Sequence, residues 1–422
     1  MKRILWAILA LVTSANAAYS QTCWTIGTDG SIELNPERIV LPYSDHIEMS
    51  GEQVSCVLRW MVDEKGLFSQ ERSLVFPMLR RVPNDTHASL LYRMGTDVMS
   101  LVGINSLVPK QLSTKKVSID GGLSVISEYG VGKANVGGAR GDNPKPVAEV
   151  RTTVFPSKVH PMLCEIYSIR NISASPLVLN VPKFSQEAKT LADKGVDGSY
   201  VIRADIFGSG TYVLEPWQEI GFQVAFQAYR EKGGSMIVPD FDAEYSARMS
   251  FIRDAIDSSL ILETPDTVIN TEFRFAKIRA SESIYRTKGG LMHGPGGESY
   301  YAALWCNDEC EYVNPFYPFL GYAVGNESAF NCYRLYSGFM NDDFKPVPSS
   351  IIAEGTDIWD GAGDRGDAAM IAHGLSRYLL ARGDKNEAEQ LWPFLKWCLE
   401  YCHRKLNAAG VPESDSDELE GR

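Results

Sequence analysis

The pattern of apolar and polar positions divides the chain into two parts. From about residue 25 to residue 230, short apolar or alternating runs are separated by Gly, Pro, Asn and Asp, which is typical of successive strands. We expect an antiparallel β-sandwich over residues 18–240, with a long loop in the glycine-rich stretch 130–146. The clearest runs are Val54 to Met61, Val147 to Phe155, Met162 to Ile169, Tyr200 to Phe207, Gly210 to Leu214 and Ile220 to Tyr229.

The spacing changes to that of a helix near Phe241, so residues 241–262 are expected to form a linker helix. Its apolar positions are Tyr245, Met249, Ile252, Ile256 and Leu260. Thr264 followed by Pro265 is typical of an N-cap with proline in the first helical position, so a second helix is expected to begin there.

Residues 263–422 are expected to form serial helical hairpins with long connections. Besides the helix that follows Thr264, helical segments are predicted near 314–340, at 367–383 and at 385–406, the last with a kink or restart at Pro393.

The N-terminus has the features of a secretory signal peptide. Lys2 and Arg3 precede a short apolar run, and Ala15-Asn16-Ala17 supplies an A-x-A cleavage site. We expect residues 1–17 to be removed, with cleavage near Ala17, and the mature protein to be secreted or periplasmic. No later uncharged stretch is long enough to span a membrane.

Chain length and net charge limit the number of domains and the classes of ligand to be expected. The chain has 422 residues, more than one core usually holds, so two domains are expected. The net charge is −12 and no basic block is present, which argues against nucleic acid and anionic lipid surfaces. A neutral or cationic ligand fits better. Oligomeric state is not indicated by the sequence.

Eight cysteines in a chain of this length do not form a disulfide scaffold. Cys23 and Cys56 are a candidate disulfide pair. Cys306 and Cys310 have C-x3-C spacing, but no second Cys or His pair completes a tetrahedral site, so no metal is predicted. Cys398 and Cys402 share the apolar face of a helix and are interpreted as structural thiols.

Three long loops in the second half combine carboxylates, glycines and aromatics. Loops of this length inside a compact domain are usually functional. Such residues suit sugar chemistry, because glycoside hydrolysis uses one carboxylic acid and one carboxylate, and aromatic rings stack on pyranose faces. The loops are His293 to Glu309, Glu354 to Asp367 and Glu413 to Gly421, and the candidate platforms are Tyr300, Trp305, Tyr312 and Trp359.

A sandwich followed by helical hairpins with these loops resembles the six-hairpin glycosidases, which include glucoamylases, trehalases, α-L-rhamnosidases and glycogen-debranching enzymes. Trp305-x-Asn307-Asp308 resembles a W-D element of that family, which implies substrate contact for Trp305 and Asp308. The neighbouring Glu309 is a further candidate for substrate binding. Gly363 to Ala369 resembles the aspartate-led start of a central barrel helix. That resemblance implies sugar binding for Asp364, Arg365 and Asp367.

The resemblance implies a general acid in the last acidic loop, where Asp417 and Glu418 are the candidates and Asp364 is the reserve. Crowded carboxylates raise the pKa of at least one member, which favours its protonated form. The expected fold is therefore a β-sandwich followed by an incomplete (α/α)6 toroid. Since only 159 residues follow Glu263, we expect a piece of a longer protein whose catalytic base lies beyond Arg422.

The leading functional prediction is an inverting glycoside hydrolase that acts on an oligosaccharide without a cofactor, and retaining chemistry stays open. Two alternatives stay open. A polysaccharide lyase would use Tyr300 or Tyr301 and His293 for proton transfer, although the domain order and the acidic charge count against it. A non-catalytic glycan-binding or scaffold protein is the other alternative.

Overall fold

The computed structural model describes residues 23–83, 85–132, 144–298, 303–354, 358–359 and 363–416, with the backbone alone at 358–359. The predicted signal peptide, most of the loop at 130–146, and Tyr300, Tyr301, Asp417 and Glu418 lie outside these residues.

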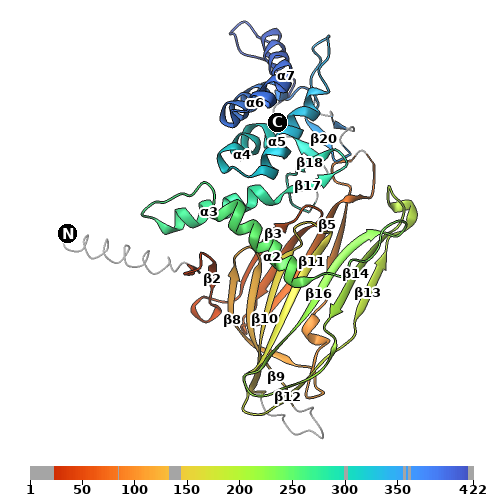
Figure 1. Cartoon of the computed structure of the whole chain (residues 1–422), viewed down its shortest axis with the longest axis vertical. Helices are drawn as coiled ribbons and strands as arrows, with labels where there is room; N and C mark the ends of the chain where they lie inside the picture. The colour runs from red at the N-terminus through yellow and green to blue at the C-terminus, as the bar shows by residue number, and fades with distance from the viewer. Residues whose placement is uncertain are drawn as a thin grey trace, which may run out of the picture.

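The predicted antiparallel strands of the first half are present and form two facing layers (Figure 1). One layer is a nine-stranded sheet in which every neighbouring pair is antiparallel. Its order is β1 (Trp24–Ile26), β2 (Ile32–Leu34), β8 (Lys110–Ile119), β9 (Leu123–Gly130), β10 (Pro146–Pro156), β11 (Met162–Asn171), β16 (Glu219–Arg230), β14 (Tyr200–Phe207) and β13 (Ser185–Lys189).

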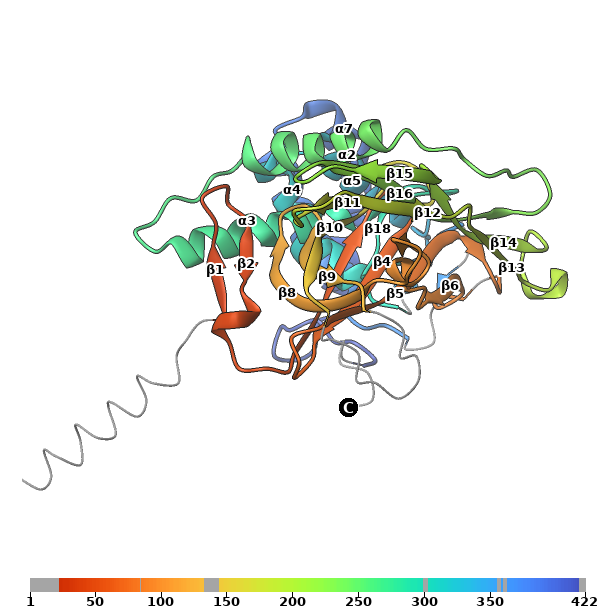
Figure 2. The same cartoon turned by 90° about the horizontal axis from the view of Figure 1, so that it is seen from below.

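The second layer contains a four-stranded sheet and a three-stranded sheet, and Figure 2 shows the four-stranded sheet facing the larger one. Alternate side chains from both layers meet in one apolar core. Short 3-10 turns lie at η1 (Pro36–Arg38), η2 (Val98–Ser100) and η3 (Ala192–Lys194). The strands of this layer are β3 (Tyr43–Ser50), β4 (Ser55–Val62), β5 (Phe68–Arg80) and β6 (Ser89–Met94), and then β15 (Gly210–Leu214), β12 (Leu177–Val181) and β7 (Gly103–Ile104).

The chain changes layers between β14 and β15. These consecutive strands lie in different sheets, with β14 beside β16 and β15 beside β12. Gly208 between them has a φ of 78°, a left-handed conformation that glycine adopts without strain.

A buried ion pair joins the two layers. Arg72 on β5 donates to both carboxylate oxygens of Glu165 on β11, at 2.5 and 2.9 Å. Tyr167 donates to the same carboxylate at 2.7 Å, and Gln70 donates to it at 3.1 Å. This polar network fixes the two sheets relative to each other inside the apolar core.

The candidate disulfide between Cys23 and Cys56 is wrong, because both thiols are free. Cys56 lies on β4 in the sandwich core, whereas Cys23 precedes β1 in the other sheet. Their strands belong to different layers, which sequence spacing does not reveal.

The linker helix begins as predicted, as α2 (Phe241–Phe251) extended by the π-helical turn η4 (Ile252–Asp257), but it ends five residues before the predicted end at residue 262. Arg248 of α2 is fully buried and donates to the carbonyl oxygens of Gly121 at 2.6 Å and Ser50 at 3.3 Å. It also pairs with Glu282, so one guanidinium ties both sheets to the helical part.

The next helix, α3 (Thr267–Glu282), begins later than predicted. Its N-cap is Asp266, whose side chain accepts from the backbone N–H of Val268 at 2.8 Å. Thr264, the predicted cap, instead accepts from the N–H of Asp266 at 3.2 Å, in the turn before the helix.

The remaining helices lie near their predicted positions, at α4 (Asn314–Leu320), α5 (Ala323–Ser337), α6 (Asp367–Arg382) and α7 (Lys385–Arg404), with a π-helical turn η5 (Asp308–Val313) before α4. Helix α7 continues through Pro393 without a restart. Two small sheets were not predicted: β17 (Ile284–Thr287) with β18 (Gly290–His293), and β19 (Ala303–Trp305) with β20 (Ser350–Ile352) and β21 (Ile358–Trp359). Runs of two to four residues are too short to show a period.

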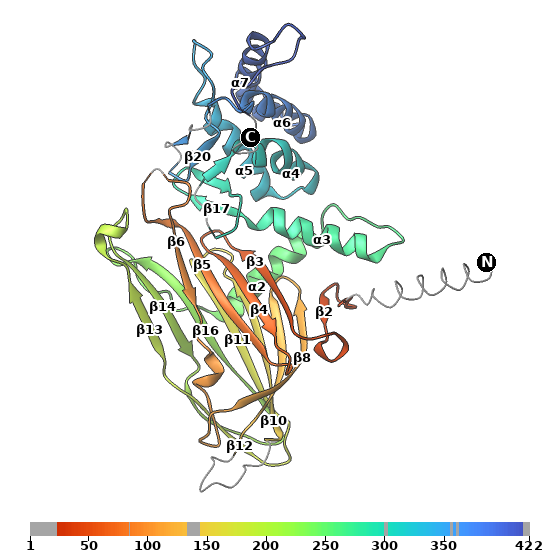
Figure 3. The same ribbon diagram turned by 180° about the vertical axis from the view of Figure 1, so that it is seen from behind.

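The helical part sits on one end of the sandwich, as Figures 1 and 3 show from opposite sides. It has its own apolar core, built mainly by α4 to α7 and β18 to β20. The described residues do not show a closed ring of helical hairpins, so the (α/α)6 toroid stays a prediction. No helix in the described ranges is long and apolar enough to cross a membrane.

Candidate functional site

The unpredicted sheet β19–β20–β21 brings two sequence-selected residues together. Trp305 pairs with Ser350, and Ser350 pairs in turn with Trp359. The two tryptophan positions are therefore at the same level of the sheet, although 54 residues separate them. The side chain of Trp359 is outside the described part of the structure, whereas that of Trp305 is 9% exposed.

Asp308 and Glu309 open the π-helical turn directly after this strand. Asp308 is partly buried, and burial raises its pKa while the charge of His293 opposes the rise. Glu309 is fully buried, and burial likewise raises its pKa against the influence of His293. These adjacent carboxyls therefore retain protons at a higher pH than ordinary surface carboxyls do.

His293 closes β18 and reaches the same turn. Its Nδ1 lies 2.9 Å from Oε1 of Glu309, and its ring makes an edge contact with Tyr317 at 6.3 Å. The second oxygen of Glu309 has no hydrogen-bond partner among the residues that the structure describes. Sequence reasoning considered His293 only for lyase chemistry and missed its pairing with Glu309.

The start of α6 adds a third buried carboxyl. Asp367 is 3% exposed, and burial raises its pKa even though Ser349 Oγ donates to it at 3.0 Å. The Cys306 N–H donates to the Ser349 carbonyl oxygen at 2.9 Å, and the Cys306 sulfur lies 3.6 Å from the Asp367 carbonyl oxygen. The two motifs selected from the sequence are therefore in contact through Ser349.

Asp364 is held by several groups of the protein itself. Tyr401 donates to its carboxylate, the ammonium of Lys405 lies 3.3 Å away, and the Gly366 N–H donates at 2.9 Å. This arrangement suits a residue that shapes the loop before α6. The catalytic role assigned to Asp364 as reserve stays a prediction.

The described start of the last acidic loop is anchored at this point. The N–H of Asp415 donates to the Asp364 carbonyl oxygen at 2.7 Å, and the Asp364 N–H donates back to the Asp415 carboxylate at 3.1 Å. Ser416 also donates to the Asp364 carbonyl oxygen, at 3.1 Å. The chain thus enters the segment of Asp417 and Glu418 beside Asp364 and Arg365.

The sandwich holds the loop that leads toward Trp305. Glu298 pairs with Arg59 on β4 at 2.5 Å and with Arg93 on β6 at 2.8 Å. The Gly297 N–H donates to Glu48 on β3 at 3.1 Å. The hydrogen bond from Arg59 is the main cause that lowers the pKa of Glu298 to about 2.

The described residues include no group of three or more His, Cys, Asp or Glu side chains placed to hold a metal ion. Cys306 and Cys310 are free thiols whose sulfur atoms lie 3.9 Å apart in the apolar core. Burial raises the pKa of Cys306 to about 12, so this thiol does not supply a ready thiolate.

No family model and no curated protein matches the sequence. Among solved structures, a protein assigned as a kojibiose phosphorylase, from human microbiome, is 9% identical with a TM-score of 0.44. The match covers 92% of this chain and 61% of the phosphorylase chain. A bacterial glucoamylase in complex with acarbose is 8% identical with a TM-score of 0.36. The match covers 87% of this chain and 69% of the glucoamylase chain.

A 4-α-glucanotransferase from Thermococcus litoralis is 11% identical with a TM-score of 0.22. The match covers 44% of this chain and 39% of the glucanotransferase chain. The phosphorylase and the glucoamylase are six-hairpin glycosidases, the family that the sequence motifs resemble. The chain spans about three-fifths of the length of the phosphorylase. At these identities and TM-scores, no activity or residue role is transferred from any of the three proteins.

Proposed function

We propose that this chain is part of an exported carbohydrate-active enzyme, a glycoside hydrolase that inverts at the anomeric carbon. The contact between the Trp305-to-Glu309 segment and the start of α6 carries the proposal. Cys306, next to Trp305 and two residues before Asp308, contacts the backbone of Asp367, and burial raises the pKa of both Asp308 and Asp367. A sugar site needs such acids beside an aromatic face.

Asp308 is the member of the adjacent carboxyl pair that is open to solvent. Its raised pKa favours the protonated form that a general acid or a hydrogen-bond donor to a sugar hydroxyl requires. Glu309 is fully buried and acts through His293 to hold the turn in place. In this proposal Arg365 and Asp367 contact further hydroxyls, and Asp417 or Glu418 protonates the leaving oxygen.

The test is hydrolysis of aryl glycosides and neutral oligosaccharides by the purified protein from the complete reading frame, read as new reducing ends. Asp308→Asn should reduce the rate by about 10²-fold or more, as expected when a proton-transfer or charge-bearing group is lost. Asp342→Asn, at an exposed carboxylate, is the matched control and should keep the wild-type rate.

Three results would change the proposal. Binding without new reducing ends would favour the non-catalytic glycan-binding alternative. Products with unsaturated ends absorbing in the ultraviolet would favour a lyase. If the protein shows no binding and no turnover with any of the sugars, the carbohydrate assignment is wrong. Export is tested separately, by N-terminal sequencing of protein secreted by an expressing cell, which should begin near Ala18.

A further inference from the structure

The sandwich contains a hollow between its two layers, and its lining includes none of the residues of the proposed catalytic site. The cavity has a volume of about 610 Å³, within the roughly 300–1,000 Å³ of small-molecule sites. Its floor is formed by β9, β10 and β11 of the nine-stranded sheet, and its roof by β5 of the four-stranded sheet. Phe68, Arg72, Tyr129, Thr152 and Tyr167 are among the lining residues.

The cavity has a mouth because β6 is shorter than its neighbour β5. The last residue of β6, Met94, pairs with Arg72, so the part of β5 that includes Ser69 and Gln70 has no strand on that side. The following segment, from Gly95 to Ser100, leaves the sheet and forms one wall of the cavity. The Arg72 guanidinium donates to the Thr96 carbonyl oxygen at 3.1 Å and holds this wall in place.

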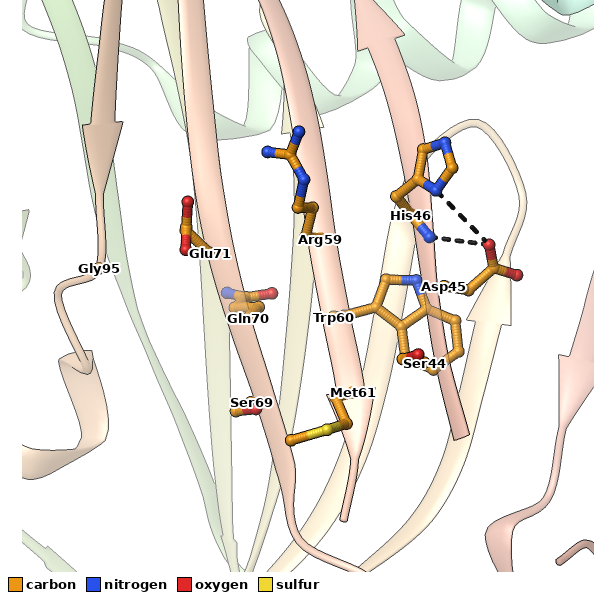
Figure 4. Close-up of a pocket in the computed structure, with 10 residues that line it drawn as sticks. All are labelled: Ser44, Asp45, His46, Arg59, Trp60, Met61, Ser69, Gln70, Glu71 and Gly95. Carbon is orange, nitrogen blue, oxygen red and sulfur yellow. Dashed lines mark hydrogen bonds and ion pairs between the residues drawn. The ribbon is translucent and has the colours of Figure 1, made fainter. Parts of the chain in front are cut away.

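A groove of about 630 Å³ lies on the four-stranded sheet next to this mouth, and Figure 4 shows the residues that line the groove. Ser69, Gln70 and Gly95 line both hollows. The groove also contains His46, Arg59 and Glu71, which lie in register across three strands. A Cβ atom added at Gly95 would have no heavy atom within 4 Å, so the mouth is open at this position.

The lining indicates the chemistry of the ligand. The hydroxyls of Tyr129 and Thr152 make no recorded hydrogen bond to the described residues, whereas the Ser127 hydroxyl is hydrogen-bonded to the side-chain amide of Gln111 at 3.0 Å. Arg72 is neutralised by Glu165, and the other charged lining residues are one cation, Lys110, and one anion, Asp97. The cavity therefore combines aromatic rings and hydroxyls with no net charge, which suits an uncharged ligand rich in hydroxyls.

We infer that this cavity is a binding site for a neutral saccharide of one or two rings, which enters from the groove past Gly95. Aromatic rings from Phe68 and Tyr129 offer apolar contact, and the hydroxyls of Tyr129 and Thr152 hydrogen-bond to those of the sugar. The site lies on the sandwich, so it is independent of the catalytic proposal for the helical part.

The experiment is saturation-transfer NMR and calorimetry on the whole chain with glucose, galactose, mannose, maltose, cellobiose and lactose. We expect at least one of these sugars to bind. Gly95→Phe should weaken that binding at least about tenfold by filling the mouth, and Tyr129→Phe should weaken it about 2- to 10-fold, the range for one hydrogen bond. Gly132→Phe and Tyr92→Phe are the matched controls, because neither residue lines the cavity.

The same sugars are then tested on Asp308→Asn and on Trp305→Ala, which alter the helical site alone. Binding that survives these changes but is lost with Gly95→Phe places the sugar in the sandwich. Binding by none of the six sugars, or binding that Gly95→Phe leaves unchanged while Trp305→Ala removes it, overturns the inference. Tight binding of 1-anilinonaphthalene-8-sulfonate, a dye with an apolar aromatic part and a sulfonate group, that Gly95→Phe abolishes, without any sugar binding, assigns the cavity to an apolar aromatic ligand instead.

Discussion

The Nδ1 atom of His293 lies 2.9 Å from a carboxylate oxygen of Glu309, with both side chains buried at the junction of β18 and η5. This contact joins the ends of the first long loop and fixes the turn that presents Asp308. Within the proposed site, Glu309 acts as a positioning residue, and Asp308 is the carboxyl that we propose to contact a ligand.

The buried carboxyls should make stability fall as pH rises. Burial raises the pKa of Glu309 above its ordinary value of 4.5, so the folded state binds more protons than the unfolded state just above that pH. The free energy of unfolding then decreases with rising pH in this window. Glu309→Gln should flatten this decrease in urea unfolding followed from pH 4.5 to 8. The exposed Glu327→Gln should leave the decrease unchanged, and equal slopes for all three proteins would contradict the assignment.

Glu298 should show the opposite dependence. Its pKa is lowered to about 2, so its stabilising effect is complete above about pH 4.5 and is lost as the pH falls toward 2. Because Arg59 and Arg93 are about half exposed, solvent screening limits the expected loss in Glu298→Gln to about 0.5–1 kcal/mol at pH 7. The difference from wild type in thermal unfolding should shrink on acidification, whereas Glu64→Gln should match wild type throughout.

Removing one partner of the Arg72–Glu165 ion pair should destabilise the protein strongly, whereas replacing both partners by apolar residues should change its stability little. Both side chains are almost fully buried, so Arg72→Met leaves an unpaired carboxylate in the core and should destabilise the sandwich by about 3–5 kcal/mol. The double variant Arg72→Met with Glu165→Leu should recover most of that loss in denaturant unfolding. A single variant that loses less than about 1 kcal/mol would show that the carboxylate finds another partner.

Gly374 should not tolerate a side chain. A Cβ atom there would lie 1.7 Å from the backbone oxygen of Cys310, because α6 packs directly on η5. Alanine normally favours a helix over glycine by about 1 kcal/mol, but overpacking here should outweigh that gain by about 1–3 kcal/mol. The melting temperature of Gly374→Ala should therefore fall, while Gly132→Ala, where the Cβ meets open space, should leave it unchanged.

Strand and helix positions were largely predictable because they depend on local periodicity. The run Met162 to Ile169 became β11, and the run from Asp367 to Gly383 became α6, which ends at Arg382. The start of α3 was misplaced by two residues, since Thr264 and Asp266 both have cap chemistry and only the backbone geometry distinguishes them. The short strands β17 to β21 were missed because they contain too few residues to show alternation.

The sequence by itself determined which residues have the chemistry of a sugar site, because residue type and loop position are local properties. Only the tertiary structure decided that Trp305 and Trp359 share a level of one sheet, and that Cys306 contacts the start of α6 through Ser349. The layer of each strand, which rules out a Cys23 to Cys56 disulfide, was likewise decided by long-range packing. Contacts between distant segments depend on how whole elements bury their apolar faces together, and no local spacing specifies that choice.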